Sequence, residues 1–154
     1  AETARKSSFK DILTVDINKS KIKELKKQGF QAIHSDLFKE LKNNKKTSKN
    51  QLFDLIIFNP PYLPLDKREP IESQVQTTAG KEGYEIILKF LTQAKNHMKK
   101  SSIILLLFSS LSKPEIILSQ AEKLGYKYKK VNSKKLFFEE LYVYEFKSSV
   151  KDIL

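Results

Sequence analysis

Short apolar runs alternate with amphipathic stretches along the whole 154-residue chain. Residues 53–58 (FDLIIF) and 102–108 are almost continuously apolar, which is typical of strands covered on both faces of a parallel sheet. Residues 83–98 and 113–124 instead carry apolar side chains at helical spacing. Strands that alternate with helices predict an α/β domain with a mostly parallel sheet.

The remaining elements follow the same alternation. We predict a helix at residues 19–28, one helical turn at 37–41, and strands at 11–16, 30–34, 126–131 and 141–146. Gly29 and Gly125 directly follow two of the predicted helices, where glycine commonly ends a helix. The last two strands are neighbours in sequence and predict an antiparallel edge. We find no internal repeat and expect one domain, residues 1–154.

Charge and composition narrow the class of protein. The chain has 29 Lys and Arg against 18 Asp and Glu, a net charge of +11, which can attract nucleic acid or the ribosome. The simpler explanation is a solvated surface, with a lysine-rich loop at residues 39–49. Without cysteine the chain has no disulfide or cysteine zinc site, and we predict no metal. No apolar run reaches the roughly 20 residues of a membrane span, and we see no signal peptide. We therefore expect a cytoplasmic protein.

The most specific motif is Asn59-Pro60-Pro61-Tyr62, directly after the predicted strand 53–58. Ligands of open α/β sheets bind outside the carboxyl ends of the strands. The two prolines stiffen the loop, Asn59 offers an oxygen acceptor, and Tyr62 offers a flat face for a planar group. Such a loop can hold a planar NH2 group and orient its lone pair. The alternative is a rigid turn, or a proline-rich ligand with a Pro-Pro-x-Tyr core.

Residues 54–62 (DLIIFNPPY) resemble the NPPY signature of amino-methyltransferases. Leu63-Pro64 and the segments 79–83 (AGKEG), 105–110 (LLLFSS) and 137–143 (FFEELYV) narrow the resemblance to the archaeal and eukaryotic release-factor glutamine methyltransferases, the HemK-like proteins. The resemblance runs over nearly the whole chain. It implies a Rossmann-like class I methyltransferase fold and S-adenosylmethionine as cofactor. The expected reaction is methylation of a glutamine side-chain amide in a peptide chain release factor, with Asn59, Pro60, Pro61 and Tyr62 as the catalytic residues.

The resemblance also implies the cofactor contacts. Asp16, at the end of the predicted strand 11–16, would bind the ribose hydroxyls, and Ile17 would flank the adenine. Asp36 would meet the adenine amino group with Leu37 beside it, and Asn59 would also border the cofactor. Read without the family, Asp16 is a strand-end cap and Asp36 is a helix N-cap.

Four other residues have side chains of a kind found in functional sites, but they form no site in the sequence pattern. His34 alternates with apolar residues and His97 lies on a lysine-rich helix end, so we expect both to be structural or solvated. Phe137 and Phe138 could contact substrate, but we expect them to pack in the core.

The family's glycine-rich cofactor loop is not found in this sequence. The four glycines are Gly29, Gly80, Gly83 and Gly125. None precedes Asp16, and residues 1–6 (AETARK) resemble the last turns of the helix that follows the loop. By family topology the absent strand lies between the strands ending at Asp16 and Phe58, and its loss exposes two rows of unpaired backbone groups. We expect another polypeptide to supply this strand and loop; a fragment of a longer protein and a degenerate, non-catalytic domain are the alternatives.

Three functions compete on the sequence alone. The segment 137–143 favours a release factor as substrate, whereas the positive charge favours methylation of an adenine or guanine amine in nucleic acid. A non-catalytic, methyltransferase-like subunit is the third. Relatives also use a small zinc-binding activator protein, so such a partner is expected here as well.

Overall fold

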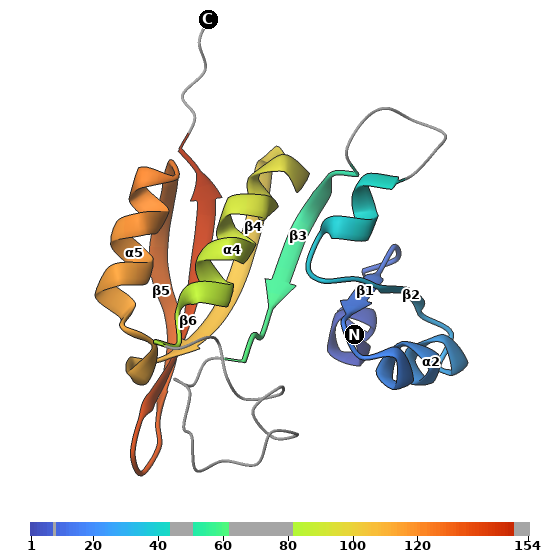
Figure 1. Cartoon of the computed structure of the whole chain (residues 1–154), viewed down its shortest axis with the longest axis horizontal. Coiled ribbons are helices and arrows are strands. Elements are labelled where there is room, and N and C mark those ends of the chain that lie inside the picture. Colours follow the sequence, from blue (N-terminus) through green and yellow to red (C-terminus); the bar gives the residue numbers. More distant parts are fainter. Residues whose placement is uncertain (8, 44–50, 62–81, 150–154) are drawn as a thin grey trace, which may run out of the picture. The chain divides into compact units, whose positions relative to one another are not determined.

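The computed structural model describes residues 1–7, 9–43, 51–61 and 82–149, without the side chains of 42 and 43. The chain forms two compact units, residues 1–51 and residues 52–154 (Figure 1). Each unit is described by itself below.

The first unit is a two-stranded parallel sheet with its connecting helix. Its elements are α1 (Glu2–Lys6), β1 (Leu13–Asp16), α2 (Lys19–Lys27), β2 (Gln31–His34) and the 3-10 helix η1 (Lys39–Asn43). β1 and β2 pair in parallel from Leu13 opposite Gln31 to Asp16 opposite His34. The side chain of Asn18 accepts hydrogen bonds from the backbone N–H groups of Ser20 and Lys21, which caps the start of α2. The buried apolar side chains of this unit are Ile22, Phe30, Ala32, Phe38 and Leu41.

The second unit is a four-stranded mixed sheet in the order β3-β4-β6-β5. Its elements are β3 (Phe53–Phe58), α4 (Glu85–Ala94), η2 (Lys95–His97), β4 (Met98–Ser109), η3 (Ser110–Ser112), α5 (Pro114–Lys123), β5 (Tyr126–Lys135) and β6 (Glu140–Ser148). β3 is parallel to β4, and β6 is antiparallel to both β4 and β5. The predicted parallel sheet with an antiparallel edge is thus confirmed.

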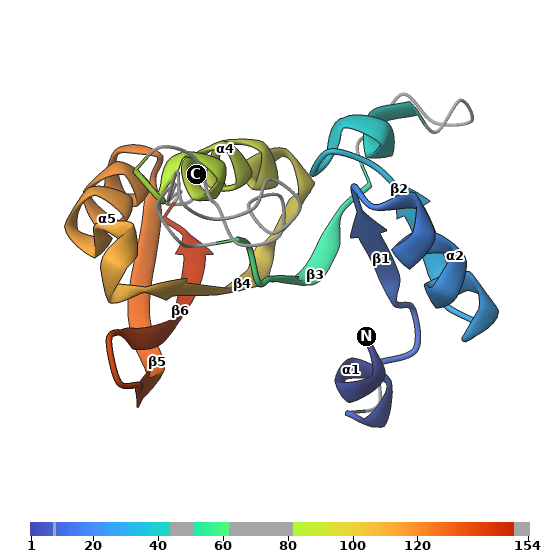
Figure 2. The same ribbon diagram turned by 60° about the horizontal axis from the view of Figure 1, so that its bottom comes forward.

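Both helices of the second unit lie on one face of this sheet (Figures 1 and 2). The side chains facing them are fully buried, among them Ile104, Leu106 and Phe108 of β4. Successive side chains of a strand point to opposite faces, and on the other face Ile57 of β3 is 61% exposed. Within the described residues, the helices of this unit therefore cover one face of the sheet, whereas Ile57 of β3 is left exposed on the other face.

The predicted boundary between the helix at 83–98 and the strand at 102–108 is wrong. The helix expected over residues 83–98 ends at Ala94, and β4 already begins at Met98. The reason is that side chains of residues 98–102 contact the start of β3. Ser102 Oγ donates to the Phe53 carbonyl at 2.5 Å, and Lys99 Nζ forms an ion pair with Asp54 at 2.7 Å. His97 at this junction is fully buried, with its ring 6.3 Å from that of Phe53, so of the two expectations for His97, structural or solvated, the solvated one is wrong.

The expected core position of Phe137 and Phe138 is also wrong. Phe137 is 92% exposed and Phe138 is 84% exposed. β5 and β6 extend further than predicted, to Lys135 and from Glu140, so the turn that joins them projects past the rest of the sheet (Figure 1). Nothing in the described part of the unit covers side chains at that distance from the core.

Candidate active site

The first group of predicted site residues lies at the carboxyl ends of β1 and β2. These ends are neighbours, because the backbone N–H of Ser35 donates to the carbonyl of Asp16 at 3.0 Å. The half-buried carboxylate of Asp16 accepts the N–H of Asn18 on Oδ1 at 2.8 Å. The strand-end cap is therefore present, and it uses one oxygen. No partner is recorded for Oδ2 within the described residues, so this oxygen can accept a hydroxyl donor.

Ile17 and His34 complete this end of the two strands. The Ile17 side chain is 62% exposed, a large apolar surface directly after the Asp16 carboxylate. Nε2 of His34 is hydrogen-bonded to the carbonyl of Ile17 at 2.9 Å. His34 thereby joins the end of β2 to the loop after β1, a structural contact of the kind expected from the sequence.

The turn after β2 holds Asp36 and Leu37 in an unusual conformation. Leu37 has φ = 53°, the left-handed region that bulky side chains rarely adopt. The buried hydroxyl of Ser35 fixes it: Oγ donates to the Leu37 carbonyl at 2.9 Å and accepts the Glu40 N–H at 3.0 Å. Asp36 forms an ion pair with Lys39 at 2.6 Å. Backbone strain of this kind gathers at ligand-binding sites.

Sequence reasoning overlooked Ser35. A serine directly after a strand is a known source of local side-chain to backbone bonds, so its position in HSDLF could have indicated this turn. Asp36 was expected either as an adenine ligand or as an N-cap. In the structure Ser35 accepts an N–H of the 3-10 turn, and the Asp36 carboxylate contacts Lys39.

Asn59 and the prolines follow β3 in the second unit, as predicted. The ring of Phe58 stacks on Phe90 of α4 with 4.2 Å between centroids and 25° between planes, which fixes the chain immediately before Asn59. Pro60 is buried and Pro61 is half-buried, whereas Asn59 is exposed. No hydrogen bond to the Asn59 side chain is recorded in the described part of the chain. Tyr62 and the motif residues 63–81 lie outside the described residues.

The neighbouring end of β4 carries polar contacts that the sequence did not predict. Ser109 is fully buried; its hydroxyl donates to the Glu139 carboxylate and accepts the Leu111 N–H at 3.1 Å. Close by in the chain, Lys113 forms an ion pair with Glu82. The hydrogen bond to that carboxylate raises the pKa of Lys113, so the lysine is charged at neutral pH.

The residues of the first unit fit the ribose and adenine of S-adenosylmethionine. A carboxylate with one oxygen available suits a hydroxyl donor such as those of a ribose, and exposed Ile17 suits the face of a base. Within residues 1–7, 9–43, 51–61 and 82–149, no group of three His, Asp or Glu side chains could hold a metal ion. Over the same ranges, no helix is both long and apolar enough to cross a membrane.

Comparison with known proteins gives two sequence matches beside a family model. The model of the Eco57I restriction-modification methylases matches residues 2–113. A Methanocaldococcus jannaschii protein named "Putative protein N5-glutamine methyltransferase" is 34% identical over 146 residues, which cover 90% of this chain and 70% of that protein. The ribosomal protein uL3 glutamine methyltransferase of Xanthomonas campestris is 26% identical over 102 residues, 62% of this chain and 33% of its own length.

Solved structures share the fold. The Mtq2–Trm112 complex of E. cuniculi, which methylates the translation termination factor eRF1, matches with a TM-score of 0.67 and 23% identity, over 96% of this chain and 78% of that one. A methyltransferase of Pyrococcus furiosus matches with a TM-score of 0.62 and 17% identity, over 96% and 68%. At these identities the likeness establishes a Rossmann-like class I methyltransferase fold. With the family model and the 34% identical relative, it shows that the chain belongs to the S-adenosylmethionine-dependent methyltransferases of the HemK-like, protein N5-glutamine methyltransferase family.

Proposed function

We propose that this protein transfers a methyl group from S-adenosylmethionine to the side-chain amide nitrogen of a glutamine in a peptide chain release factor. The observation that carries the proposal is the position of Asn59. Its side chain is exposed at the carboxyl end of β3, in a chain 34% identical to a relative named for glutamine methylation. Because translation termination takes place in the cytoplasm, the proposed location is cytoplasmic.

The chemistry required of Asn59 is orientation. Its side-chain oxygen and the Pro60 carbonyl would each accept one hydrogen of the target NH2 group, and Tyr62 would pack against the plane of that group. An amide nitrogen is a weak nucleophile, because its lone pair is delocalised into the carbonyl. Holding both hydrogens favours the geometry in which the lone pair points at the methyl group. In the transfer, a new N–C bond would replace the S–C bond of the methyl donor, and the target nitrogen, held by Asn59 and Pro60, would release a proton to solvent.

The first unit would hold the cofactor. Asp16 would accept the ribose hydroxyls, Ile17 would lie against the adenine, and Asp36 with Leu37 would border the adenine amino group. The carboxylate contacts and the exposed apolar side chain reported above support this assignment. When bound, S-adenosylmethionine supplies the electrophilic methyl group.

We also propose that another polypeptide segment completes the fold with a strand and a glycine-rich loop. Among the described residues β1 pairs only with β2, and β3 pairs only with β4. Parallel sheets are normally covered on both faces, yet Val15 of β1 is 38% exposed and Ile57 of β3 is 61% exposed. A strand added beside either edge, with its helix over these side chains, would bury them. A small activator protein, such as the Trm112 that accompanies Mtq2 in its complex, is a further proposed partner.

Methylation of a nucleic-acid amine is the second candidate. The match to the Eco57I restriction-modification methylases and the net charge of +11 favour it. Adenine and glutamine present similar planar NH2 groups, so the loop at Asn59 suits both. A subunit that keeps the fold without catalysis would bind no cofactor.

One experiment separates these functions. The chain is purified together with its completing polypeptide and incubated with S-adenosylmethionine carrying a labelled methyl group. Release factor, tRNA and DNA are then offered separately. We expect label on the release factor alone. Label on tRNA or DNA alone would replace the proposal with the second candidate, and failure to bind the cofactor at all would favour the non-catalytic subunit.

A further inference from the structure

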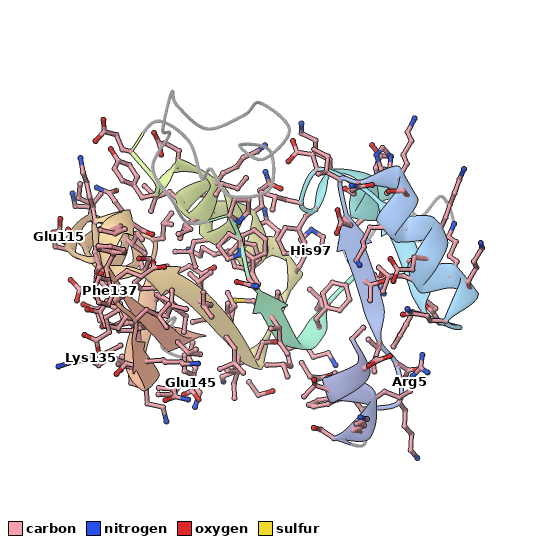
Figure 3. The ribbon with its side chains drawn as sticks, turned by 90° about the horizontal axis from the view of Figure 1, so that it is seen from below. Arg5, His97, Glu115, Lys135, Phe137 and Glu145 are labelled. Atoms are coloured by element: carbon pink, nitrogen blue, oxygen red, sulfur yellow. The ribbon has the colours of Figure 1, made fainter. Side chains whose placement is uncertain are left out.

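The turn between β5 and β6 presents an apolar tip to solvent. Phe137 is 92% exposed, Phe138 is 84% exposed, and Leu136 before them is 42% exposed; Figure 3 labels Phe137 and its neighbour Lys135. The two rings meet edge to face with 4.6 Å between centroids. We call these three residues the aromatic turn. Adjacent exposed apolar residues of this size typically mark a contact surface rather than ordinary protein surface.

The aromatic turn is held in place by hydrogen bonds. The Leu136 N–H donates to the Glu139 carbonyl at 2.8 Å, which closes the turn. The Ser109 hydroxyl donates to the Glu139 carboxylate, and the Glu140 N–H donates to Ser110 Oγ at 3.0 Å. These bonds attach the turn to the end of β4. A contact element that is already ordered loses little conformational entropy on binding.

The turn lies at the edge of the sheet that carries the catalytic loop. Ser109 at the end of β4 pairs with Leu141 near the start of β6, so the turn projects past the carboxyl end of β4. β3 is parallel to β4, and its carboxyl end, followed by Asn59, points the same way (Figure 1). A substrate that brings an amide to Asn59 therefore approaches the edge from which the aromatic turn projects.

We propose that the aromatic turn is a docking element for the protein substrate and inserts into an apolar pocket on that protein's surface, away from the glutamine itself. The proposal rests on the proposed function above and adds to it how the substrate is selected. The enzyme would then recognise the folded surface of its substrate as well as the sequence around the glutamine.

The charges around the turn favour a protein as its occupant. Lys134 and Lys135 precede the rings and have no ion pair recorded within the described residues, whereas Glu139 and Glu140 follow the rings directly. Both signs therefore flank the apolar centre, as in protein interfaces with a polar rim. A nucleic acid would bring its phosphates close to the two carboxylates, which opposes binding.

The test compares two substrates of the enzyme purified with its completing polypeptide. Phe137→Ser combined with Phe138→Ser removes both rings, and Val131→Ser on β5 (45% exposed) is the matched control. The intact release factor and a short peptide around its glutamine are methylated in parallel. For the double variant we expect KM for the intact protein to rise about tenfold or more, as for a central contact residue, with kcat unchanged. The peptide lacks the pocket, so its kinetics should not change, and the control should match wild type throughout.

The outcomes are distinct. If wild type methylates the release factor and the double variant has the same KM for it, the docking element is overturned and the proposed function is not affected. An equal loss on peptide and protein also overturns it, because the rings would then serve the active site itself. Binding of single-stranded RNA is measured as well. If the double variant loses this binding and keeps its KM for the protein, the turn is a nucleic-acid element instead. If wild type methylates neither substrate, the proposed function fails and this inference fails with it. An unchanged melting temperature verifies that the double variant folds.

Discussion

At the residue scale, Asp16 makes the strand-end cap contact, and we propose that it also binds the ribose hydroxyls, the role that the sequence presented as the alternative. Oδ1 accepts the Asn18 N–H and shapes the start of α2, while Oδ2 can accept a ligand hydroxyl. Asn18 in turn accepts the N–H groups of Ser20 and Lys21, so it supports the same turn without offering a carboxylate. This pair allows the cap to be separated from the ligand.

We predict different outcomes for Asp16→Ala and Asn18→Ala. Asp16→Ala should weaken S-adenosylmethionine binding about tenfold to a hundredfold, because charge-assisted hydrogen bonds contribute roughly 1.5–3 kcal/mol. Asn18→Ala should cost about 1 kcal/mol of folding stability through the lost cap and change affinity little. Calorimetric titration and thermal melting of the completed enzyme measure the two effects. An equal loss of affinity in both variants would mean that Asp16 acts only as a cap.

Asn59 should matter much more for turnover than for cofactor affinity. Asn59→Ala removes an acceptor that is most needed in the transition state, where the target nitrogen gains positive charge, so turnover should fall about a hundredfold or more. Asn59→Asp keeps an acceptor and should retain partial activity. Single-turnover methylation at saturating cofactor is the measurement. Near wild-type turnover in Asn59→Ala would leave the motif as a rigid turn.

At the element scale, periodicity identified the strands and helices. A helix or strand that buries one face or both faces has apolar residues at the matching positions of the sequence. It could not identify the left-handed Leu37, since that conformation depends on hydrogen bonds from Ser35 to a carbonyl and an N–H further along the chain. The exposed Phe137 and Phe138 were missed for another reason. Apolar residues normally enter the core, and only the length of β5 and β6 places these two beyond it.

The contact between β4 and the β5–β6 turn should be stabilising. Ser109→Ala removes a fully buried hydroxyl and leaves the Leu111 N–H and the Glu139 carboxylate without this partner. We expect unfolding in urea to require about 1–3 kcal/mol less free energy. Ser133→Ala, at an exposed position of β5, is the control and should stay within about 0.5 kcal/mol of wild type. Equal stability of the two variants would show that the Ser109 contact contributes nothing.

At the scale of the whole molecule, the main expectation rests on the edges of β1 and β3, with which no second described strand pairs, and on the exposed apolar side chains Val15 and Ile57. The chain expressed by itself should be insoluble or should melt broadly, because exposed strand edges pair with other chains and part of the apolar surface stays in water. With a polypeptide that supplies the strand and glycine-rich loop, the melt should become sharp. Calorimetry of both preparations is the test, and a sharp two-state transition of the lone chain would contradict the expectation.

The most direct test of the central claim is to identify the atom that receives the methyl group. The completed enzyme is incubated with a release factor and S-adenosylmethionine, and the digested product is sequenced by mass spectrometry, with Asn59→Ala as the matched inactive control. We predict one added methyl group on a glutamine side-chain amide, present with wild type and nearly absent with Asn59→Ala. Methylation at any other residue, methylation of nucleic acid alone, or equal methylation by the variant would contradict this account.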